Sequence, residues 1–469
     1  MRRRGSFDVL VAGGGTAGAL AGIAAARTGA RTLIVEQYGS LGGVLSLGMS
    51  LKGVHDGDGY KTLGGLGEEL LDRARTMRGA TAVAAHPRHG SVTGQDPEAM
   101  KLALIEMARD SGVGLLFHSF LVDAAVDAAS ITSIRVANKA GLETLQARCF
   151  VDCTGDADLA ARAGARVVLG READGRMQPA SAIFRVGGVD LDRTWAYLAG
   201  HPEDFEAPAG SVDAAFSVGA FRATPGVGVA GFKSLIAKAR AAGDYTIPRD
   251  DMGFNPLPGR REVTINITRV HGVDATDPDD LTRAEIESQL QVLEALRFLR
   301  KYVPGFDNCY VVSQPFQIGV RESRRIVGGY VLTGEDVLAG RDFDDQVARG
   351  AYPYDIHDVA GGAAGRGTNL SMIRRSYGIP ARCLIAEGVA NLVVAGRCLS
   401  ATHEAASSAR GQPVAMATGH AAGTIAALSA IRGARPGDLP VREIQSVLRT
   451  QGAVIERPSN PVRPEGSPA

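Results

Sequence analysis

The chain has 469 residues, enough for two or three structural units of about 150 residues each. Its hydrophobic fraction of 45% is ordinary for a globular protein, and 51 Lys and Arg balance 51 Asp and Glu, so nothing in the charge indicates nucleic acid or an acidic partner. The cysteines are odd in number and form no C-x-x-C pair, which argues against a disulfide framework or a metal site and favours buried thiols in a reducing compartment: Cys149, Cys153, Cys309, Cys383 and Cys398.

Two features resemble signals for export or for a membrane span, and we interpret both as parts of the fold. The apolar residues after Arg2, Arg3 and Arg4 belong to a predicted strand, and no cleavage-type segment follows them. The longest apolar stretches, near 19–26 and 413–430, are interrupted and rich in Gly and Ala, too weak for a membrane span. We therefore expect a cytoplasmic protein that binds no membrane.

The first forty residues predict a nucleotide-binding βαβ unit. An apolar strand at 8–12 runs into a glycine turn, an Ala-rich helix follows to Thr28, and a second strand at 31–35 ends at Glu36. Gly13 permits the tight turn, Gly15 lets the backbone approach a pyrophosphate, and Gly18 lets the helix sit close to the sheet. The helix N-terminus favours phosphate, and an acid at this distance suits ribose hydroxyls.

The later elements, in chain order, predict a sheet interrupted by an insertion. Helices are expected at 66–78 and 97–111, and strands at 113–120, 121–129, 131–137 and 145–153. Residues 184–188 and 263–269 alternate as half-buried strands do, and 279–302 is an amphipathic helix stopped by proline and glycine. A buried strand at 391–396 and a helix from Gln412 through Ala427 repeat the pattern of the first forty residues, a buried strand followed by glycine and an Ala-rich helix.

These elements predict an α/β fold with a discontinuous Rossmann-type nucleotide domain and an inserted α+β substrate domain on a mixed sheet. The nucleotide domain takes 1–55, 96–176 and 381–432. An insert or cap takes 56–95, the substrate domain 177–380, and a tail 433–469, frayed from 456. A second glycine pattern at 226–231 follows Pro225 and precedes no acid-tipped strand, so we expect no second dinucleotide site there.

The βαβ unit alone does not distinguish NAD from FAD, and three later segments favour FAD. Gly42 and Gly43 can lay backbone along the far half of a cofactor, and a strand at 151–153 ends in a glycine turn. Gly396 leads to a second helix N-terminus at Gln412. That end suits the negative charge that reduced flavin holds near N1 and C2=O, and a reduced nicotinamide holds no comparable anion.

At these segments the chain resembles the FAD-dependent oxidoreductases of the glutathione-reductase-type flavin fold, near the fumarate-reductase and thiazole-synthesis-like branches. Within them it is most similar to a bacterial subgroup whose substrates are not defined. The matching segments are 8–43, 151–164, 177–190, 319–326, 352–358 and 391–423. The resemblance implies non-covalent FAD. It places Gly13, Gly15 and Gly18 on the pyrophosphate, Glu36 on the ribose and Val122 beside adenine.

The full set of cofactor residues expected from the motifs and the resemblance is Gly13, Gly15, Thr16, Ala17, Gly18, Glu36, Gln37, Gly42, Gly43, Val122, Thr154, Gly155, Asp156, Gly396, Arg397, Arg410, Gln412, Pro413 and Val414. One departure concerns Arg397. Many relatives of the wider fold carry Asp after the equivalent of Gly396, so the contact of that Asp with the cofactor must come from elsewhere.

Candidate catalytic residues fall in a charged run and at two histidines. Arg321, Glu322 and Arg324 follow an apolar strand, as a carboxylate clamp or as a solvated helix face. His357, with carboxylates on either side, is either a tuned proton donor or acceptor or a structural turn histidine. His403 precedes the flavin-facing helix, where it either contacts the ring or braces the loop.

We therefore expect hydride transfer between flavin N5 and a carbon of a small, carboxylate-bearing substrate, as a dehydrogenase or a C=C reductase. The alternatives are a flavin monooxygenase or oxidase using O2 and a non-catalytic or electron-transfer flavoprotein subunit. The expected partners are the small-molecule substrate and an electron donor or acceptor of unknown identity. A homodimer paired through the inserted domain is a further hypothesis.

Overall fold

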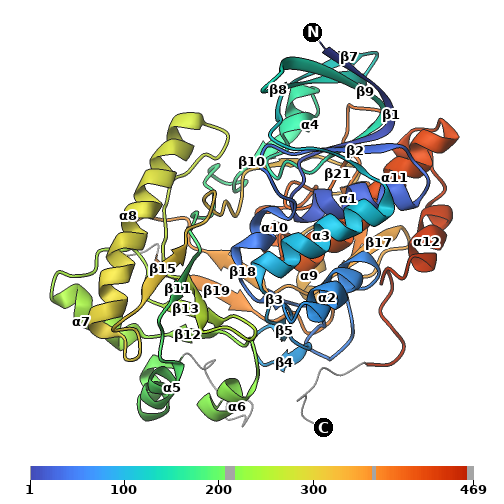
Figure 1. The fold of residues 1–469 in the computed structure, drawn as a ribbon. Coiled ribbons are helices and arrows are strands. Elements are labelled where there is room, and N and C mark those ends of the chain that lie inside the picture. Colours follow the sequence, from blue (N-terminus) through green and yellow to red (C-terminus); the bar gives the residue numbers. More distant parts are fainter. Residues whose placement is uncertain (1, 206–216, 362–365, 462–469) are drawn as a thin grey trace.

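A seven-stranded sheet forms the centre of the larger of two units, seen on the right of Figure 1. The computed structural model describes residues 2–205, 217–361 and 366–461. Strands β6 (Gly114–Leu116), β2 (Thr32–Val35), β1 (Arg2–Ala12) and β9 (Gly141–Asp152) are parallel neighbours in that order. Strand β21 (Leu392–Val394) pairs in parallel with the end of β9.

The long strand β9 pairs in parallel with β1 along nearly its whole length and carries an antiparallel ribbon on its other edge. Its first half pairs with β8 (Ser130–Asn138), which pairs with β7 (Phe120–Asp127). The two predicted ribbon strands at 121–129 and 131–137 are thus confirmed. The strand predicted at 113–120 is shorter than expected, and the one at 145–153 begins four residues earlier.

Helices cover both faces of this sheet, because the strands are buried on both sides. On one face lie α1 (Thr16–Arg27), α2 (Leu66–Thr76), α3 (Pro97–Ser111) and α11 (Gln412–Arg432). Val9 and Val11 point into this core, whereas Leu10 and Ala12 point into the core on the other face, where α4 (Asp158–Arg162) packs. The glycine turn and the α/β architecture with a parallel Rossmann-type sheet are as predicted.

Helices α1 and α11 approach each other through glycines. A Cβ at Gly419 would lie 2.2 Å from the carbonyl oxygen of Ala17, and one at Gly423 would lie 2.0 Å from that of Ala21. Only glycine permits this backbone contact, which joins segments about 400 residues apart in the chain. The contact brings the first turns of α1 and α11 to the same edge of the sheet.

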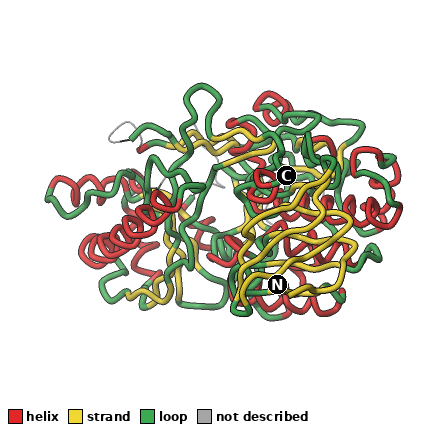
Figure 2. Tube along the Cα trace, turned by 90° about the horizontal axis from the view of Figure 1, so that it is seen from above, coloured by secondary structure: helices red, strands yellow, loops and turns green. Residues whose placement is uncertain are grey.

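The second unit, on the left of Figure 1 and again at one side in the view of Figure 2, has a five-stranded sheet. Its order is β12 (Val229–Gly231), β13 (Met252–Pro256), β14 (Glu262–Asn266), β11 (Phe184–Gly187) and β15 (Tyr310–Ser313). Every pairing described in this sheet is antiparallel, so the expectation of a mixed sheet is wrong. Helix α8 (Pro278–Tyr302) buries Val292 and Phe298 in the core of this unit.

Smaller elements complete this unit: α5 (Leu191–Gly200), α6 (Val218–Ala223) and α7 (Lys233–Ala241). The second glycine pattern lies here, in β12 and the loop before it. A Cβ at Gly226 would meet the backbone of Gly94, and one at Gly228 would meet Asn255. These glycines therefore serve close packing within the protein, which agrees with the expectation of no second dinucleotide loop.

The predicted domain boundaries are corrected in two places by the cores. In 56–95, α2 packs in the core of the larger unit, whereas the hairpin β4 (Ala84–His86) and β5 (Gly90–Thr93) packs in that of the smaller one. In 177–380, the part after 326 returns to the larger unit, where Val337 of α9 (Gly334–Ala339) is buried. Burial of apolar faces, which the order of elements does not reveal, decides both cases.

The remaining strands form short pairs: β3 (Leu51–Lys52) with β5, β10 (Val167–Leu169) with β16 (Arg324–Ile326), β17 (Gln346–Gly350) with β20 (Tyr377–Pro380), and β18 (Tyr354–His357) with β19 (Thr368–Ser371). Helix α10 (His403–Ala409) precedes α11. The segment predicted as a tail contains α12 (Val441–Thr450), with Ile444 and Leu448 buried, so it is folded there; residues 462–469 lie outside the described part.

Helix α11 and the cysteines are core elements. The helix is long and apolar enough to cross a membrane by length and composition, but 89% of its apolar window is buried inside the structure, as expected of a central helix. All five cysteines are free and buried, as predicted.

Replacing Gly423 by Ala should destabilise the protein by roughly 1–3 kcal/mol, because the added methyl group forces the α1 backbone away. Gly219→Ala in α6 is the matched control, since its Cβ would meet only one side-chain atom at 3.8 Å. Chemical denaturation followed by circular dichroism measures both. Equal stability of G423A and the wild type would contradict close packing of α1 and α11.

His420 of α11 should make the protein acid-sensitive. Burial lowers its pKa from 6.5 to about 4. Below pH 6.5 the unfolded chain takes up a proton that the folded chain refuses, so stability falls as the pH drops from about 6.5 towards 4. Between pH 7 and pH 5, His420→Gln should lose ~2 kcal/mol less unfolding free energy than the wild type.

The control for H420Q is His201→Gln, because His201 is exposed. Denaturation of the three proteins at both pH values gives the comparison. An identical pH-dependent loss in H420Q and the wild type would show that His420 does not carry the effect.

Candidate functional site

A cavity of about 660 Å³ lies where the two units meet, and residues of both units line it. One end is lined by the first turns of α1 and α11 and by the loops after β9 and β21. The other end is lined by β3, the β4–β5 hairpin, the loop before β13 and the β18–β19 pair. We call these the cradle end and the inner end.

The glycine turn shapes the cradle end in the way its spacing predicts. Gly13 has φ +90°, and a Cβ there would lie 2.5 Å from the carbonyl oxygen of Cys153. A Cβ at Gly18 would lie 1.8 Å from the Gly13 carbonyl oxygen. At Gly15, by contrast, a Cβ would meet nothing within 4 Å, and the residue lines the cavity. Gly13 and Gly18 therefore serve the fold, whereas Gly15 leaves its space to a ligand.

Glu36 is buried and supports the turn from behind. Its Oε2 accepts from the Gly14 amide at 2.6 Å, and its Oε1 accepts from the Tyr38 amide at 2.8 Å. Burial raises the pKa of this carboxyl, although these backbone donors oppose the shift. Glu36 does not line the cavity, so its contact with a ribose stays a prediction.

The two helix N-termini are tied together at the cradle. Thr16 Oγ1, in the first turn of α1, lies 2.5 Å from Gln412 Oε1, in the first turn of α11, and 2.9 Å from the Gly42 carbonyl oxygen. Gly15, Thr16, Gly411 and Gln412 all line the cavity. Two positive helix ends therefore face one space, which suits a ligand with negative charge in two places.

Arg397 forms an ion pair with Asp156 across the cradle end, and Ser323 Oγ also contacts this carboxylate, at 2.5 Å. The Arg397 guanidinium lies against Gly155, where a Cβ would come within 3.1 Å of it. Both Arg397 and Gly155 line the cavity, whereas Asp156 does not. At the position where the wider fold often has Asp after the glycine, this chain thus has an Arg neutralised by an Asp from the loop after β9.

The structure brings most of the predicted cofactor residues to the cavity: Gly15, Thr16, Ala17, Gly43, Thr154, Gly155, Gly396, Arg397, Arg410 and Gln412 line it. The others do not. Gly13, Gly18 and Gly42 shape the turns, Pro413 and Val414 are buried within α11, and Asp156 pairs with Arg397. Gln37 and Val122 are exposed, and Val122 lies on β7 of the ribbon.

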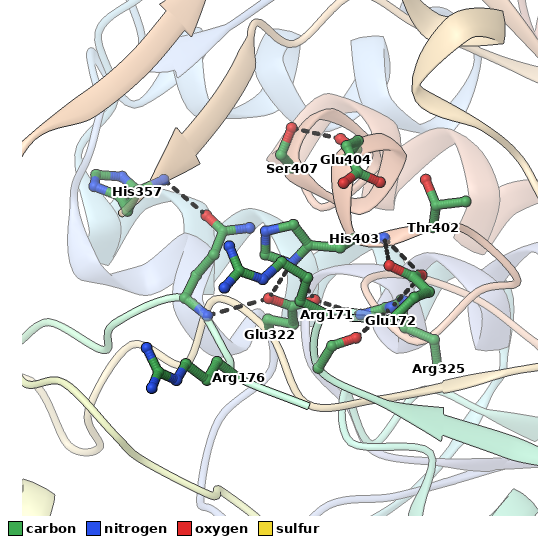
Figure 3. Close-up of polar contacts among 12 residues, drawn as sticks. Arg171, Glu172, Arg176, Glu322, Arg325, His357, Thr402, His403, Glu404 and Ser407 are labelled. Carbon is green, nitrogen blue, oxygen red and sulfur yellow. Dashed lines mark hydrogen bonds and ion pairs between the residues drawn. The ribbon is translucent and has the colours of Figure 1, made fainter. Parts of the chain in front are cut away.

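Glu322, Arg324 and His403 were predicted as catalytic, and the structure places all three outside the cavity. Figure 3 shows His403 and Arg325 converging on Glu322, with His403 Nδ1 at 2.9 Å and Arg325 Nη1 at 2.5 Å from its oxygens. Arg324 donates to the carbonyl of Asp156. From Arg324 the charged run forms the short strand β16, and Glu322 and Arg325 join a buried network, so the run is not a solvated helix face, and only Arg321 of it lines the cavity.

His357, by contrast, lines the cavity. Arg269 Nη2 and Thr368 Oγ1 each lie 3.0 Å from its Nδ1, and its Nε2 lies 3.4 Å from Asp355 Oδ1. Arg269 can only donate, so Nδ1 is the acceptor and Nε2 carries the hydrogen. Burial and the neighbouring Arg321 lower the pKa of His357 to about 3, so the imidazole is neutral at physiological pH.

The inner end is rich in cations. Arg321 donates to the carbonyl of Pro179 and to Ser181 Oγ. Arg249 pairs with Asp251 at 2.6 Å, and Arg410 pairs with Asp355 at 3.1 Å. Over the cavity as a whole, eight lining residues are Lys or Arg and three are Asp, so the lining favours an anionic ligand.

Sequence reasoning missed several residues of the inner end. Arg249, Asp251 and Thr368 are separated from the motifs in sequence, and only the meeting of the two units brings them to the cavity. Lys52 lies in a short strand of two residues, after the loop that follows Gly43. The only signal for Lys52 was its place shortly after the glycine pair, and that signal is weak.

The cradle end fits FAD on observations of this chain alone. Gly15 offers open space at a helix N-terminus, and two helix ends converge. The Nε atoms of Arg397 and Arg410 are buried and have no hydrogen-bond partner within the described residues, although both side chains line the cavity. Buried donors of this kind are satisfied when a ligand supplies acceptors. Gly15, Thr16, Gly155 and Gln412 are the residues we expect to hold the cofactor.

Comparison with known proteins supports this cofactor. A family described as FAD dependent oxidoreductase matches residues 8–448. Similar solved structures include a geranylgeranyl bacteriochlorophyll reductase-like protein from Thermoplasma acidophilum (12% identity, 96% of this chain, 85% of that chain, TM-score 0.46). GidA of Aquifex aeolicus is similar at 14% identity over 96% of this chain and 69% of that chain, with a TM-score of 0.46. The p-nitrophenol 4-monooxygenase PnpA from Pseudomonas putida DLL-E4 is similar at 11% identity over 96% of this chain and 84% of that chain, with a TM-score of 0.44. Identities this low carry no information about the substrate.

Gly15→Val should abolish most FAD binding without unfolding the chain. The new side chain meets no protein atom near its Cβ, but it fills the place where a pyrophosphate approaches the backbone. We expect affinity for FAD to fall on the order of a hundredfold. Flavin absorbance after FAD reconstitution measures binding, and circular dichroism monitors folding. Gly200→Val, at an open position far along α5, is the control, and a folded G15V protein with full flavin content would contradict the cradle.

Proposed function

This chain belongs to the FAD dependent oxidoreductase family, and we propose that it transfers a hydride between flavin N5 and a carbon atom of a small, carboxylate-bearing substrate. The reaction is a dehydrogenation or the reverse reduction of a C=C bond. FAD supplies the electron chemistry, and the protein supplies position, charge and exclusion of water. The sequence resemblance to the fumarate-reductase and thiazole-synthesis-like branches is part of this proposal.

The observation that carries the proposal is the state of Arg321. Its guanidinium lines the cavity beside the cradle, and its hydrogen-bond partners are the neutral oxygens of Pro179 and Ser181. Within the described residues, no carboxylate lies at ion-pair distance from it. Burial, with Arg410, Arg249 and Arg269 nearby, lowers its pKa well below the usual value.

A cation without a counter-ion in a largely desolvated cavity is costly, and an anionic ligand relieves that cost. The planar fork of a guanidinium matches a carboxylate with two parallel hydrogen bonds. Arg321 therefore supports a substrate carboxylate bound at the inner end, next to the flavin site. The neutral oxygens of Pro179 and Ser181 hold the Arg321 side chain in place without neutralising its positive charge.

His357 has a positioning role in this proposal. As a neutral acceptor at Nδ1 it fixes the guanidinium of Arg269 and the hydroxyl of Thr368, and its Nε2–H points to Asp355. With its pKa lowered to about 3, it does not donate a proton at neutral pH. Glu322 and His403, buried outside the cavity, do not reach a substrate there either.

The first experiment on this proposal uses the purified protein and its visible spectrum before and after acid precipitation. Flavin in the supernatant indicates a non-covalent cofactor, whereas colour in the pellet indicates a covalent link. Anaerobic bleaching of the flavin is then screened with small carboxylic acids and their amides. Bleaching by acids but not by amides supports the proposal. Substrate-dependent hydroxylation with consumption of O2 and NAD(P)H would instead favour a monooxygenase.

Arg321→Met should lower kcat/KM for the bleaching substrate on the order of a hundredfold, because the carboxylate loses its partner. Flavin content should stay unchanged, since Arg321 lies beyond the cradle. Stopped-flow reduction under anaerobic conditions measures the rates. Arg166→Met is the control, because that side chain is exposed and forms a long ion pair with Glu387 at 3.8 Å. Wild-type kinetics in R321M would show that the substrate is held elsewhere.

A further inference from the structure

Lys52 is a lysine of the inner end for which the fold provides no partner. It follows Leu51 in the short strand β3, which pairs with β5, and it lines the cavity. Within the described part of the chain, its ammonium has no hydrogen bond or ion pair. By comparison, Lys61 pairs with Glu68, Lys101 with Glu98 and Lys301 with Asp244.

The charged groups around Lys52 come from every element that borders it. Asp355 of β18 is the acidic neighbour, whereas Arg88 of the β4–β5 hairpin, Arg249 before β13 and Arg410 after α10 are cationic. Burial lowers the pKa of His86 and of His89 in the hairpin, and the charge of Lys52 adds to this effect, so both imidazoles are neutral. Lys52 is thus surrounded by more positive than negative charge.

Asp355 does not neutralise Lys52, because this carboxylate is already in use. Its oxygens take the Arg410 guanidinium at 3.1 Å, the Tyr352 hydroxyl at 3.1 Å and His357 Nε2 at 3.4 Å. Burial acts to raise the pKa of Asp355, but His357, Arg410 and Arg321 lower it well below its usual value, so the group stays a carboxylate that is saturated by donors. The ammonium of this cavity-lining lysine is therefore a donor that a ligand can use.

We propose that Lys52 is an anion-binding group of the substrate cavity, distinct from Arg321, and that it holds a carboxylate of the substrate only while its ammonium is protonated. This inference rests on the proposed function, because it concerns the same inner end. It adds a residue that determines specificity, namely for substrates that carry negative charge on the Lys52 side as well. No atom of the flavin is needed for this contact.

The pH dependence follows from the surroundings of Lys52. Burial lowers its pKa from 10.5 to about 8, and the neighbouring Arg88, Arg249 and Arg410 act in the same direction. Above pH 8 the free protein loses the positive charge, and binding an anion must then be accompanied by uptake of a proton. Affinity for the anion is therefore full at pH 7 and falls about tenfold by pH 9, one unit above that pKa.

The test uses calorimetric titration of the FAD-loaded protein with oxalate, malonate and succinate, which present two carboxylates at increasing spacing. The best of the three is then measured at pH 7 and pH 9. We expect affinity at pH 9 about tenfold lower, with proton uptake shown by a dependence of the heat on the buffer. Failure of all three to bind the wild type at pH 7 overturns the proposal.

Two variants at position 52 separate charge from shape. Lys52→Met should bind the anion at pH 7 as weakly as the wild type does at pH 9 or more weakly, without pH dependence. Lys52→Arg should keep its affinity at both pH values, because a guanidinium remains charged. Lys139→Met is the matched control, since Lys139 is exposed in the turn between β8 and β9 and should behave as the wild type.

Two results would overturn the proposal even if FAD binds and a reaction is found. One is unchanged anion affinity in K52M at pH 7. The other is a change in the flavin spectrum and midpoint potential of K52M while anion affinity stays that of the wild type, which would assign the charge of Lys52 to the cofactor. Because the titrations need no turnover, they remain informative if the hydride-transfer reaction itself is disproved.

Discussion

The close packing of α1 against α11 is the constraint on which the site depends. Gly419 and Gly423 let the α11 backbone reach the carbonyl oxygens of Ala17 and Ala21. The contact sets the first turns of both helices side by side, where Thr16 meets Gln412. A wider separation of the helices would leave two isolated helix ends, each a weak anion site, in place of one cradle with positive potential at two points.

The cavity combines two kinds of electrostatic environment. At the cradle end, backbone donors and helix ends face a cofactor that carries its own negative charge, and Arg397 is neutralised by Asp156. At the inner end, Arg321 and Lys52 have no carboxylate at ion-pair distance within the described residues, and burial lowers the pKa of both, while His357 is held neutral. Burying cations without partners is unfavourable for stability, and proteins keep such groups where a ligand supplies the missing charge.

The sequence predicted the elements with strong local signals well. The helix at 97–111 has a proline in its first turn and a capping Asp96, and the structure gives it the same bounds. The glycine turn was predicted residue by residue, because each glycine answers a local steric demand. The long helix predicted at 279–302 differs from α8 by one residue at its start. Family membership and FAD also follow from motifs of this kind.

Predictions that needed contacts between distant segments succeeded less often. The charged run at 321–325 looked like one functional cluster, but the chain bends so that Arg321 lines the cavity while Glu322 and Arg325 join a buried network with His403. Lys52, Arg249 and Asp251 gave no motif, because their role arises only where two units meet. Ala84 and Val92 likewise pack in the core of the smaller unit, a contact between distant segments that no local pattern indicates.

By itself, the sequence therefore determined the nucleotide-binding loop, the helices around it and the cofactor class, since these depend on backbone conformation and on apolar spacing within about forty residues. Only the tertiary structure decided which charged residues face the ligand and which balance one another in the interior. Charges interact across space regardless of their separation in sequence, and burial determines both their protonation and whether a partner or a ligand must supply the opposite charge.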